Sequence, residues 1–501
     1  MTLNRQTAAP APRPGNEPRR FINDIIWIGL SQIFTSLLGI VSLPALTKSY
    51  STEMYGVWAQ VMVTVNLIIP LVTLYLGNAA IRFLSAEEDP LKRRQYLGSM
   101  LTAIIISAGV ILIIVNLLAS QFSLFLFDSP RYVIFVRLTA VWVFISGLYV
   151  FLVQYLRSRR QIKRLSIMLT AYSAVKILTI VALAKTGFSL EWVIGALIGV
   201  DAALFGVLFY MVVRGVGFPT PNFRHLRGFL VFSIPQIPSG ILLWIIAFSD
   251  RYFITHFLDL SQTGVYSSSN VLGGIISLCF SPINYVLYPA VSRAWEEKRL
   301  SEVKNYFEYS NKLFLTLAIP AAAGVAILSQ PLLQVLATSQ YLAGWQLVLL
   351  VAIGTIFLGI YQNNAFIILL IKKTQWLPFM ILLASATSLG VNFLLIPRIG
   401  ILGAAVSNIA AYFVLAAIVS WWARKSINYN FDIKYLGKVV AAALIMSAGL
   451  YFFKVEGWLI VAAIIGGIII FGAALLILRA FSRQDKVLIK QVLGERVPWI
   501  Y

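Results

Sequence analysis

The sequence predicts an all-α protein that crosses a membrane about fourteen times. Of its 501 residues, 59% are hydrophobic and only 12% are charged, which leaves too little polar surface to cover a soluble protein of this length. Fourteen apolar stretches each approach the roughly 20 residues that a helix needs to cross about 30 Å of hydrocarbon. Lys and Arg also alternate between the two sides of these stretches, with 32 of the 40 in one set of segments and six in the other. This alternation is the positive-inside pattern of a polytopic membrane protein.

The predicted spans follow one another with short loops. The uncharged run 313–371 is divided near Pro331 and Gln334, which interrupt it. Only the segment 293–312 is expected to form a longer loop, so no appended soluble catalytic domain is predicted. The predicted spans are 21–46, 56–78, 97–118, 133–156, 165–184, 190–213, 229–250, 264–290, 312–333, 344–371, 375–396, 400–422, 435–453 and 457–479.

The basic residues also predict the orientation. They place both termini in the cytoplasm, with residues 1–20 as a Pro-rich disordered tail and 480–501 as a second tail. The tail 1–20 has no apolar core or cleavage site, which argues against a signal peptide. Because the net charge of +21 lies mainly in short loops at one membrane face, it suits anionic lipid headgroups and predicts no nucleic-acid partner.

A faint internal repeat predicts two lobes of six helices. Tyr55-Gly56-Val57-Trp58 opens the second span and is echoed by Thr263-Gly264-Val265-Tyr266, which opens the eighth. Gly187, between the fifth and sixth spans, is echoed by Gly400, between the eleventh and twelfth. The echoed helices run the same way, so an axis along the membrane normal would relate the lobes. The predicted division is an N-lobe at 21–213, a C-lobe at 229–422 and two further helices at 435–479.

Motifs for enzyme chemistry are missing from the sequence. There is no GxxxxGK[ST] phosphate loop, and the two histidines, His225 and His256, have neither HExxH nor Cys/His spacing. Cys279 is the single cysteine and lies in an apolar segment, which excludes an intrachain disulfide. We therefore expect no catalytic residue, no metal site and no cofactor, and we do not expect an enzyme.

Two charged residues lie deep in the predicted membrane. Lys176 is nine residues before Lys185 at the external end of the fifth span, and Asp201 is eleven residues after Leu190 at the external start of the sixth. At 1.5 Å per residue both lie roughly 14 to 17 Å below the outer face, so they can pair across the hairpin. The pair has two open interpretations, a structural pair that neutralises two buried charges or a charged element that faces a transport cavity.

Further charged residues lie near the predicted membrane faces. Asp250 and Arg251 end the seventh span at the external side, and Arg137 lies about one turn inside the fourth from the same side. These three predict an ion pair that closes an outer gate, with interface anchoring as the alternative. Asn78 and Arg82 end the second span at the cytoplasmic side, within reach of an anionic headgroup, although Arg82 could equally snorkel to the interface.

Polar side chains also form two stripes along predicted helices. In the eighth span a polar stripe repeats at helical spacing, and in the first span a stripe at fourfold spacing is joined by Gln32. Together they could line a cavity suited to sugar, with interhelical hydrogen bonding as the structural alternative. Pro235 and Pro238 predict a kink in the seventh span. The stripe residues are Asn270, Ser277, Ser281, Asn284 and Tyr288 in the eighth span, and Asn23, Trp27, Ser31 and Thr35 in the first.

Short motifs follow a characteristic order along the chain. They are Leu43-Pro44, Ser51 to Trp58, Gly77 to Phe83, Pro235 to Ser239, Ser249 to Ile254, Gly264 to Ser267, Ser281-Pro282 and Tyr288-Pro289. With the fourteen spans, this order resembles the polysaccharide-transporter family, the Wzx-type oligosaccharide flippases of the multidrug/oligosaccharidyl-lipid/polysaccharide exporter superfamily. The resemblance covers nearly the whole chain.

The resemblance implies both a mechanism and a set of partners. It implies two lobes around a central cavity, alternating access, and transfer of a polyprenyl-pyrophosphate-linked oligosaccharide from the inner to the outer leaflet of the bacterial inner membrane. The product would be a surface polysaccharide such as a lipopolysaccharide or an exopolysaccharide. Membrane lipid, a polysaccharide polymerase and a chain-length regulator are the implied partners. The cationic cavity that such proteins carry would here depend on Lys176, Arg82 and Arg137.

Two other functions remain as alternatives. A drug or small-molecule cation antiporter of the same superfamily would need a deep carboxylate without a lysine partner, which Asp201 beside Lys176 argues against. A membrane polysaccharide polymerase would need paired acidic residues or arginines in a large external loop. The longest external segment, about 119–132, holds only Asp128 and Arg131.

Overall fold

The protein is an all-helical bundle, seen in a computed structural model that describes residues 40–159, 161–429, 432–452, 457 and 459–480. Within these residues, thirteen helical stretches are long and apolar enough to cross a membrane. They correspond to the second through the fourteenth predicted spans. The first predicted span lies mostly outside the described residues. Only its end is described, where residues 40–49 are helical.

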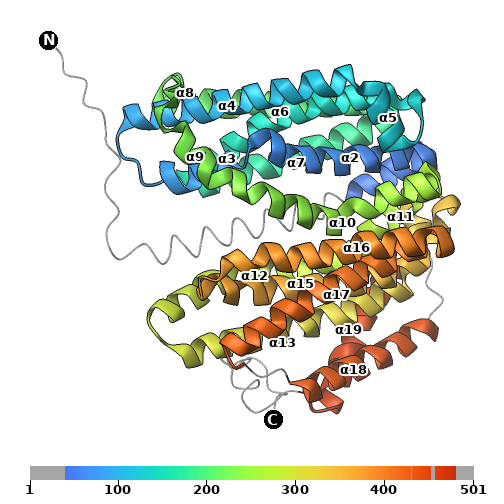
Figure 1. Ribbon diagram of the computed structural model, residues 1–501. Coiled ribbons are helices and arrows are strands. Elements are labelled where there is room, and N and C mark those ends of the chain that lie inside the picture. The colour runs from blue at the N-terminus through green and yellow to red at the C-terminus, as the bar shows by residue number, and fades with distance from the viewer. Residues whose placement is uncertain (1–39, 160, 430–431, 453–456, 458, 481–501) are drawn as a thin grey trace.

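Figure 1 shows the helices in two groups. The first group holds α2 (Thr52–Thr73), α3 (Leu76–Ala79), η1 (Ala80–Leu84), α4 (Pro90–Leu117), α5 (Ala119–Phe127), η2 (Pro130–Tyr132), α6 (Val133–Ser158), α7 (Ile162–Lys185) and α8 (Leu190–Val216). The second holds α12 (Ser277–Glu296), α13 (Leu300–Ile327), α14 (Ser329–Leu336), η6 (Ser339–Gly344), α15 (Trp345–Leu370), η7 (Thr374–Trp376), α16 (Leu377–Ile399) and α17 (Ile401–Ser426), with α18 (Ile433–Phe452) and α19 (Leu459–Ile477) beside α13.

The seventh and eighth spans lie between the two groups. The seventh consists of η3 (Phe223–His225), α9 (Leu226–Ser233), η4 (Ile234–Gln236) and α10 (Ile237–Phe257), and the eighth begins with α11 (Leu260–Gly273) and η5 (Gly274–Ile276). Helix α9 packs against α3 and α4, whereas α10 packs mainly against α16 and α17. The seventh span is thus shared between the groups. The predicted lobe boundaries at 213 and 229 stay a prediction.

Capping residues explain where several helices begin. The Ser51 side chain accepts a hydrogen bond from the Met54 amide (3.2 Å), and Asp89 caps α4 by accepting from the Leu91 amide (2.9 Å). Gly187 and Gly400 have φ values of +78° and +64°, a left-handed geometry that favours glycine at such tight turns. The two echoed glycines therefore form equivalent turns between helices in the two halves of the chain.

The predicted loop 293–312 is wrong. Helix α12 continues to Glu296 and α13 already begins at Leu300, so only a short turn remains. Arg293 Nε lies 2.9 Å from Glu297 Oε1, and Arg299 forms ion pairs with Glu297 and Glu302. Charge pairs at helical spacing stabilise helix outside the apolar stretch, which is the signal that hydrophobicity alone misses.

Two spans are interrupted at the same level. The kink predicted at Pro235 and Pro238 is confirmed, because α9 gives way there to a 3-10 turn before α10. The second span is broken as well, at Leu74 and Tyr75, whose φ values of 49° and 53° are unusual for non-glycine residues. This second break was not expected from the sequence.

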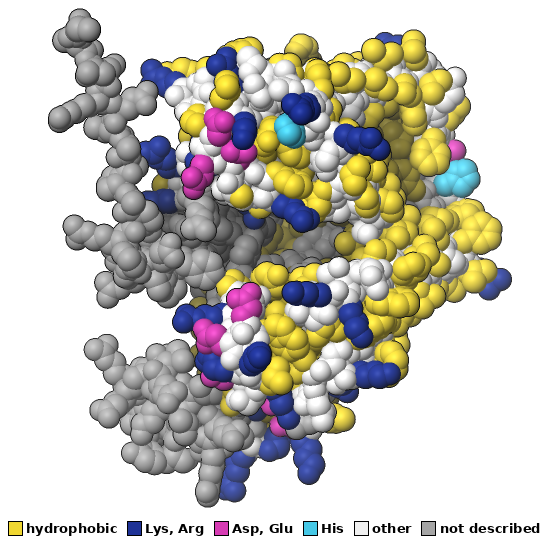
Figure 2. Space-filling view, turned by 60° about the vertical axis from the view of Figure 1, so that its left-hand side comes forward, with side chains coloured by type: hydrophobic (Ala, Val, Ile, Leu, Met, Phe, Trp, Pro, Cys, Tyr) yellow, Lys and Arg dark blue, Asp and Glu magenta, His cyan; other side chains and the backbone are white. Residues whose placement is uncertain are grey.

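The charged residues gather at one end of the bundle, which we call the basic end. It carries Arg93, Arg157, Arg224, Arg299 and Lys373, whereas Lys48, Arg131 and Lys185 lie at the opposite end. Figure 2 looks toward the basic end and shows Lys and Arg spread over both groups, with a hollow between them. The segregation of charge matches the positive-inside pattern, while the direction of insertion stays a prediction.

Candidate functional site

A buried carboxylate lies at the centre of the first group of helices. Asp201 on α8 is fully buried, and each of its oxygens has partners. Oδ2 accepts hydrogen bonds from Trp142 Nε1 (2.9 Å) and Ser146 Oγ (2.8 Å), and Oδ1 accepts one from the Tyr172 hydroxyl (2.7 Å). Three neutral donors thus stabilise a charge that would be costly to bury alone.

Lys176 provides the fourth partner. Its Nζ lies 3.1 Å from Asp201 Oδ1 and donates to the Tyr172 hydroxyl at 3.0 Å. The Lys176 side chain is 20% exposed, whereas that of Asp201 is completely buried. The amine also lies near the rings of Trp142 and Tyr172, 5.2 and 5.1 Å from their centroids. The structure therefore brings together the two residues that their equal depth predicts as partners.

Helical spacing explains how this Asp201 cluster forms. Trp142, Ser146 and Tyr149 lie four and three residues apart on α6, so they share one face. Tyr172 and Lys176 are four apart on α7, and the Tyr149 hydroxyl lies 3.1 Å from that of Tyr172. The three aromatic residues and Ser146 were not predicted from the sequence. Their spacing within apolar helices is the signal that could have found them.

A second buried carboxylate lies on α10. Asp250 and Arg251 are 3% and 6% exposed, and Arg251 Nη1 lies 2.9 Å from Asp250 Oδ1. The other carboxylate oxygen accepts a hydrogen bond from the Tyr266 hydroxyl of α11. The side chain of Asn270, one turn farther along α11, also interacts with Tyr266. Asp250, Arg251, Tyr266 and Asn270 form the Asp250 cluster.

Asp250 does not pair with Arg137 in this structure, and the outer-gate role of Asp250, Arg251 and Arg137 stays a prediction. Asp250 pairs with its neighbour Arg251, and among the ion pairs of the described residues none involves Arg137, which is exposed on α6. Helix α10 also continues to Phe257, so Asp250 and Arg251 lie about two turns inside the helix and not at its end. The predicted span ended at residue 250, whereas the helix includes Tyr252 to Phe257, most of which are apolar or aromatic.

The two broken spans meet near the basic end. Asn78 Nδ2 donates to Gln236 Oε1 (2.7 Å), which ties α3 to the kink of the seventh span. Arg82 is exposed, and its guanidinium lies 4.5 Å from the centroid of the Phe232 ring. The structure thus joins Asn78 and Arg82 to the seventh span, a neighbour that the sequence did not indicate.

The predicted polar stripe of the eighth span is divided. Asn270 belongs to α11 and Asn284 to α12, with the 3-10 turn Gly274–Ile276 between them. Asn284 Nδ2 donates to Gln362 Oε1 of α15 at 3.1 Å, and Tyr288 is exposed. Asn284 thus bonds within the second group of helices. Gln32 and its stripe in the first span lie outside the described residues.

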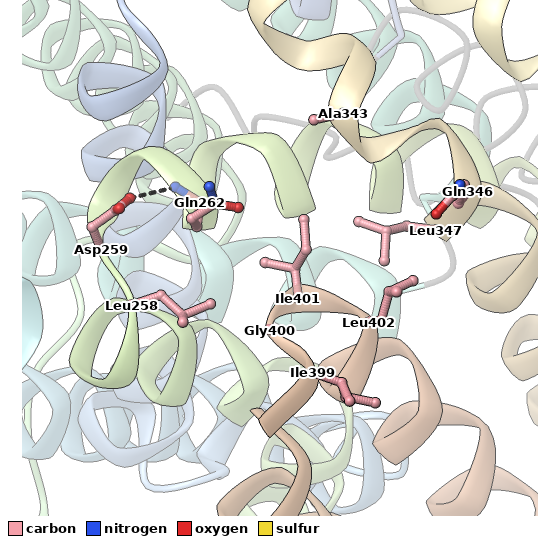
Figure 3. A pocket seen from close by; sticks show the side chains of 10 residues that line it. All are labelled: Leu258, Asp259, Gln262, Ala343, Gln346, Leu347, Ile399, Gly400, Ile401 and Leu402. Carbon is pink, nitrogen blue, oxygen red and sulfur yellow. Dashed lines mark hydrogen bonds between the residues drawn. The ribbon is translucent and has the colours of Figure 1, made fainter. Parts of the chain in front are cut away.

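A separate pocket of about 430 Å³ lies at the opposite end of the second group. Figure 3 shows its largely apolar lining, which comes from three turns of the chain, at residues 258–262, 343–347 and 399–402. Asp259 accepts a hydrogen bond from the Gln262 amide (2.7 Å), so its carboxylate caps α11. None of the predicted site residues lines this pocket. Within the described residues, no group of three or more His, Cys, Asp or Glu side chains could hold a metal ion.

Comparison with known proteins places this arrangement in context. Residues 47–345 match the model of a family described as polysaccharide biosynthesis protein. The chain is 22% identical over 240 residues to the "Probable low-salt glycan biosynthesis flippase Agl15" of Haloferax volcanii, a match that covers 47% of this chain and 50% of that protein. The chain thus spans half or less of the curated relatives that it matches.

Solved structures show the same fold. The lipid II flippase MurJ in its inward closed conformation superposes with a TM-score of 0.77 at 15% identity, over 93% of this chain and 99% of that one. An inward-facing multidrug resistance MATE family transporter of the MOP superfamily gives 0.66 at 12% identity, over 79% and 94% of the two chains. An outward-facing structure of a transporter with the same description gives 0.57 at 11% identity, over 82% and 95%.

Proposed function

The chain belongs to the polysaccharide biosynthesis protein family, and from this premise we propose that it is a flippase for a lipid-linked glycan. The cargo would be a polyprenyl-pyrophosphate-linked oligosaccharide, moved from the inner to the outer leaflet of the bacterial inner membrane for surface polysaccharide synthesis. The similarity to a protein named as a probable glycan biosynthesis flippase supports the proposal. The observation that carries it is the Lys176–Asp201 pair inside an apolar helix bundle, with the carboxylate fully buried and the amine partly exposed.

The contacts of this pair suit a temporary exchange of partners. Asp201 keeps three neutral donors when Lys176 turns away, so its charge stays solvated by the protein. The partly exposed amine of Lys176 is then free to meet a phosphate oxygen of the cargo. Arg82, exposed near the basic end, is placed for an earlier contact with the same anion.

The remaining candidate residues have secondary roles in this proposal. Gln32, Asn78, Asn270 and Asn284 offer amide groups to the sugar, and Asp250 with Arg251 belongs to the outer gate. Arg137, which lacks the expected partner, is better assigned to the membrane interface. With the basic end in the cytoplasm, an anionic headgroup moves outward down an inside-negative potential, worth about 2.3 kcal/mol per charge per 100 mV. ATP is then unnecessary in principle.

The competing functions have less support. A cation antiporter would need a deep carboxylate free to release its cargo or proton, but Asp201 and Asp250 each carry a cationic partner. A polymerase would need catalytic side chains in a sizeable loop, and the family and its relatives point to transport and not to enzymes. A polysaccharide polymerase and a chain-length regulator are proposed as partners that act on the delivered repeat unit.

A deletion strain complemented by variants tests the proposal. Loss of the protein should trap the lipid-linked oligosaccharide on the cytoplasmic leaflet and abolish the surface polysaccharide. Wild-type protein and Lys176→Arg should restore delivery better than Lys176→Ala at equal membrane abundance, because arginine keeps the cation. Normal delivery in a deletion strain without a paralogue would refute the flippase assignment.

A further inference from the structure

Two helices from opposite halves of the chain meet at a pair of glycines. Helices α2 and α11 both begin at the opposite end from the basic residues and run side by side (Figure 1). A Cβ atom at Gly56 would lie 1.9 Å from the Leu260 carbonyl oxygen, and one at Gly264 would lie 2.2 Å from the Thr52 carbonyl oxygen. Neither space admits even a methyl group, so the two backbones are in direct contact.

The contact is reciprocal. Each glycine faces the carbonyl of a residue four positions before the other glycine, Leu260 before Gly264 and Thr52 before Gly56. The two echoed segments of the sequence therefore pack against each other through equivalent atoms. Small residues that let helix backbones touch are a common means of helix association in membranes. We call this contact the glycine crossing.

Other contacts along α2 reinforce the crossing. The rings of Tyr55 and Tyr341 meet edge to face with centroids 5.8 Å apart. The Thr64 hydroxyl of α2 lies 2.7 Å from the Tyr252 hydroxyl of α10, and Trp244 Nε1 donates to the Val63 carbonyl at 2.9 Å. These interactions join the first half of the chain to the second along α2.

Two polar side chains just below the crossing have no hydrogen-bond partner among the described residues. Gln60 lies one turn beyond Gly56 on the same face of α2 and is fully buried, yet neither of its amide atoms has a hydrogen-bond partner among the described residues. Ser267, three residues beyond Gly264 on α11, is 5% exposed, and its hydroxyl is equally unpaired. Buried unpaired polar groups are costly, so this closed arrangement contains groups that would gain from contact with water or sugar hydroxyls.

We propose that the glycine crossing is the external closure of this transporter, and that its opening exposes Gln60 and Ser267 to the outward-facing cavity. Close backbone contact at Gly56 and Gly264 stabilises the closed arrangement. The unpaired groups of Gln60 and Ser267 lower the cost of leaving it, because separation of α2 and α11 supplies them with partners. The direction of opening rests on the proposed function, which places this end outside the cell.

Cysteine labelling tests the closure directly. In a Cys279→Ser background, Ser267→Cys reports exposure to a membrane-impermeant maleimide added outside intact cells. Gly56→Ala and Gly264→Ala should each raise the labelling rate about tenfold, because a Cβ cannot fit in the closed crossing. The matched control is Gly199→Ala on α8, where a Cβ meets no atom within 4 Å. Equal labelling in the crossing variants and the control, at equal membrane abundance, would overturn the proposal.

A second variant keeps the test decisive if the glycine variants fail to fold. Gln60→Leu removes the unpaired amide without adding bulk, so it should favour closure and lower the labelling of Ser267→Cys about threefold or more. Unchanged or increased labelling would contradict the proposal. Labelling and glycan export are separate measurements. Failure of the labelling prediction with normal export therefore rejects only the closure, whereas normal glycan delivery in the deletion strain rejects only the flippase function.

Discussion

The Asp201 and Asp250 clusters solve the same problem in different ways. Asp201 is surrounded by three neutral donors and a lysine that is 20% exposed, all within the first group of helices. Asp250 accepts hydrogen bonds from the buried guanidinium and the backbone amide of Arg251 and from the Tyr266 hydroxyl, between two helices that lie at the boundary of the groups. A buried carboxylate can therefore either tolerate the loss of its cationic partner or depend on that partner for stability. The difference lies in how many neutral side chains donate to the carboxylate, three at Asp201 and one at Asp250, and in how deeply the cation is buried.

The largest effect is expected at Arg251. Arg251→Ala leaves Asp250 charged and buried with one remaining side-chain donor, which should cost about 3 to 5 kcal/mol of folding free energy. Membrane abundance and thermal unfolding in detergent measure the loss, with Arg214→Ala as the control, because Arg214 is an exposed arginine near the basic end. If the two variants are equally stable, Asp250 does not depend on Arg251 for its stability.

A somewhat smaller loss is expected at Asp201. Asp201→Ala deprives Trp142 and Ser146 of their common acceptor, and the two buried donors should cost about 3 kcal/mol together. Asp201→Asn keeps one carbonyl acceptor and should fall between this variant and the wild type. Thermal unfolding with Asp128→Ala as an exposed control provides the measurement. A fully stable Asp201→Ala would show that the donors find other partners.

Lys176 should separate stability from transport. Lys176→Ala leaves Asp201 with its three neutral donors, so the expected loss of stability is about 1 to 2 kcal/mol. Glycan export should fall much further than protein abundance does, with Lys185→Ala as the control on the same helix. Export that simply follows abundance would favour the structural interpretation of the pair.

Exchange of the two charges sharpens the same point. If attraction alone mattered, Lys176→Asp with Asp201→Lys would restore folding. The structure predicts that it does not, because Trp142 Nε1 would then point at an ammonium group instead of a carboxylate. Recovery of wild-type abundance in the double variant would show that the neutral donors contribute little.

The smallest effect is expected at the edge of the Asp201 cluster. Tyr149→Phe removes a hydroxyl that contacts two neutral side chains, those of Tyr172 and Ser146, which should cost about 0.5 to 1 kcal/mol. Tyr172→Phe, which removes contacts with both Asp201 and Lys176, should cost more. The order of the two unfolding temperatures checks the assignment, and a reversed order would place Tyr149 closer to the charge than its contacts indicate.

The sequence by itself determined the order of the thirteen described spans and the matching depths of Lys176 and Asp201. Apolar length and the positions of Lys and Arg are local properties, because lipid selects helices of about 20 apolar residues whatever their neighbours are. Depth follows from the rise per residue, which is why Lys176 and Asp201 could be matched before their contact was seen. The proline kink of the seventh span is equally local.

Only the tertiary structure decided which polar groups share a cluster. Trp142 and Tyr172 reach Asp201 because α6, α7 and α8 pack with these side chains turned toward one another. Hydropathy does not specify how each helix is rotated about its own axis. The same holds for Arg137, which had the right depth to meet Asp250 but lies on an exposed face. The contact of Gly56 with Gly264 joins residues about 210 positions apart. The depth of a residue is set by its own helix, whereas the direction in which its side chain points is set by all the helices that pack around it.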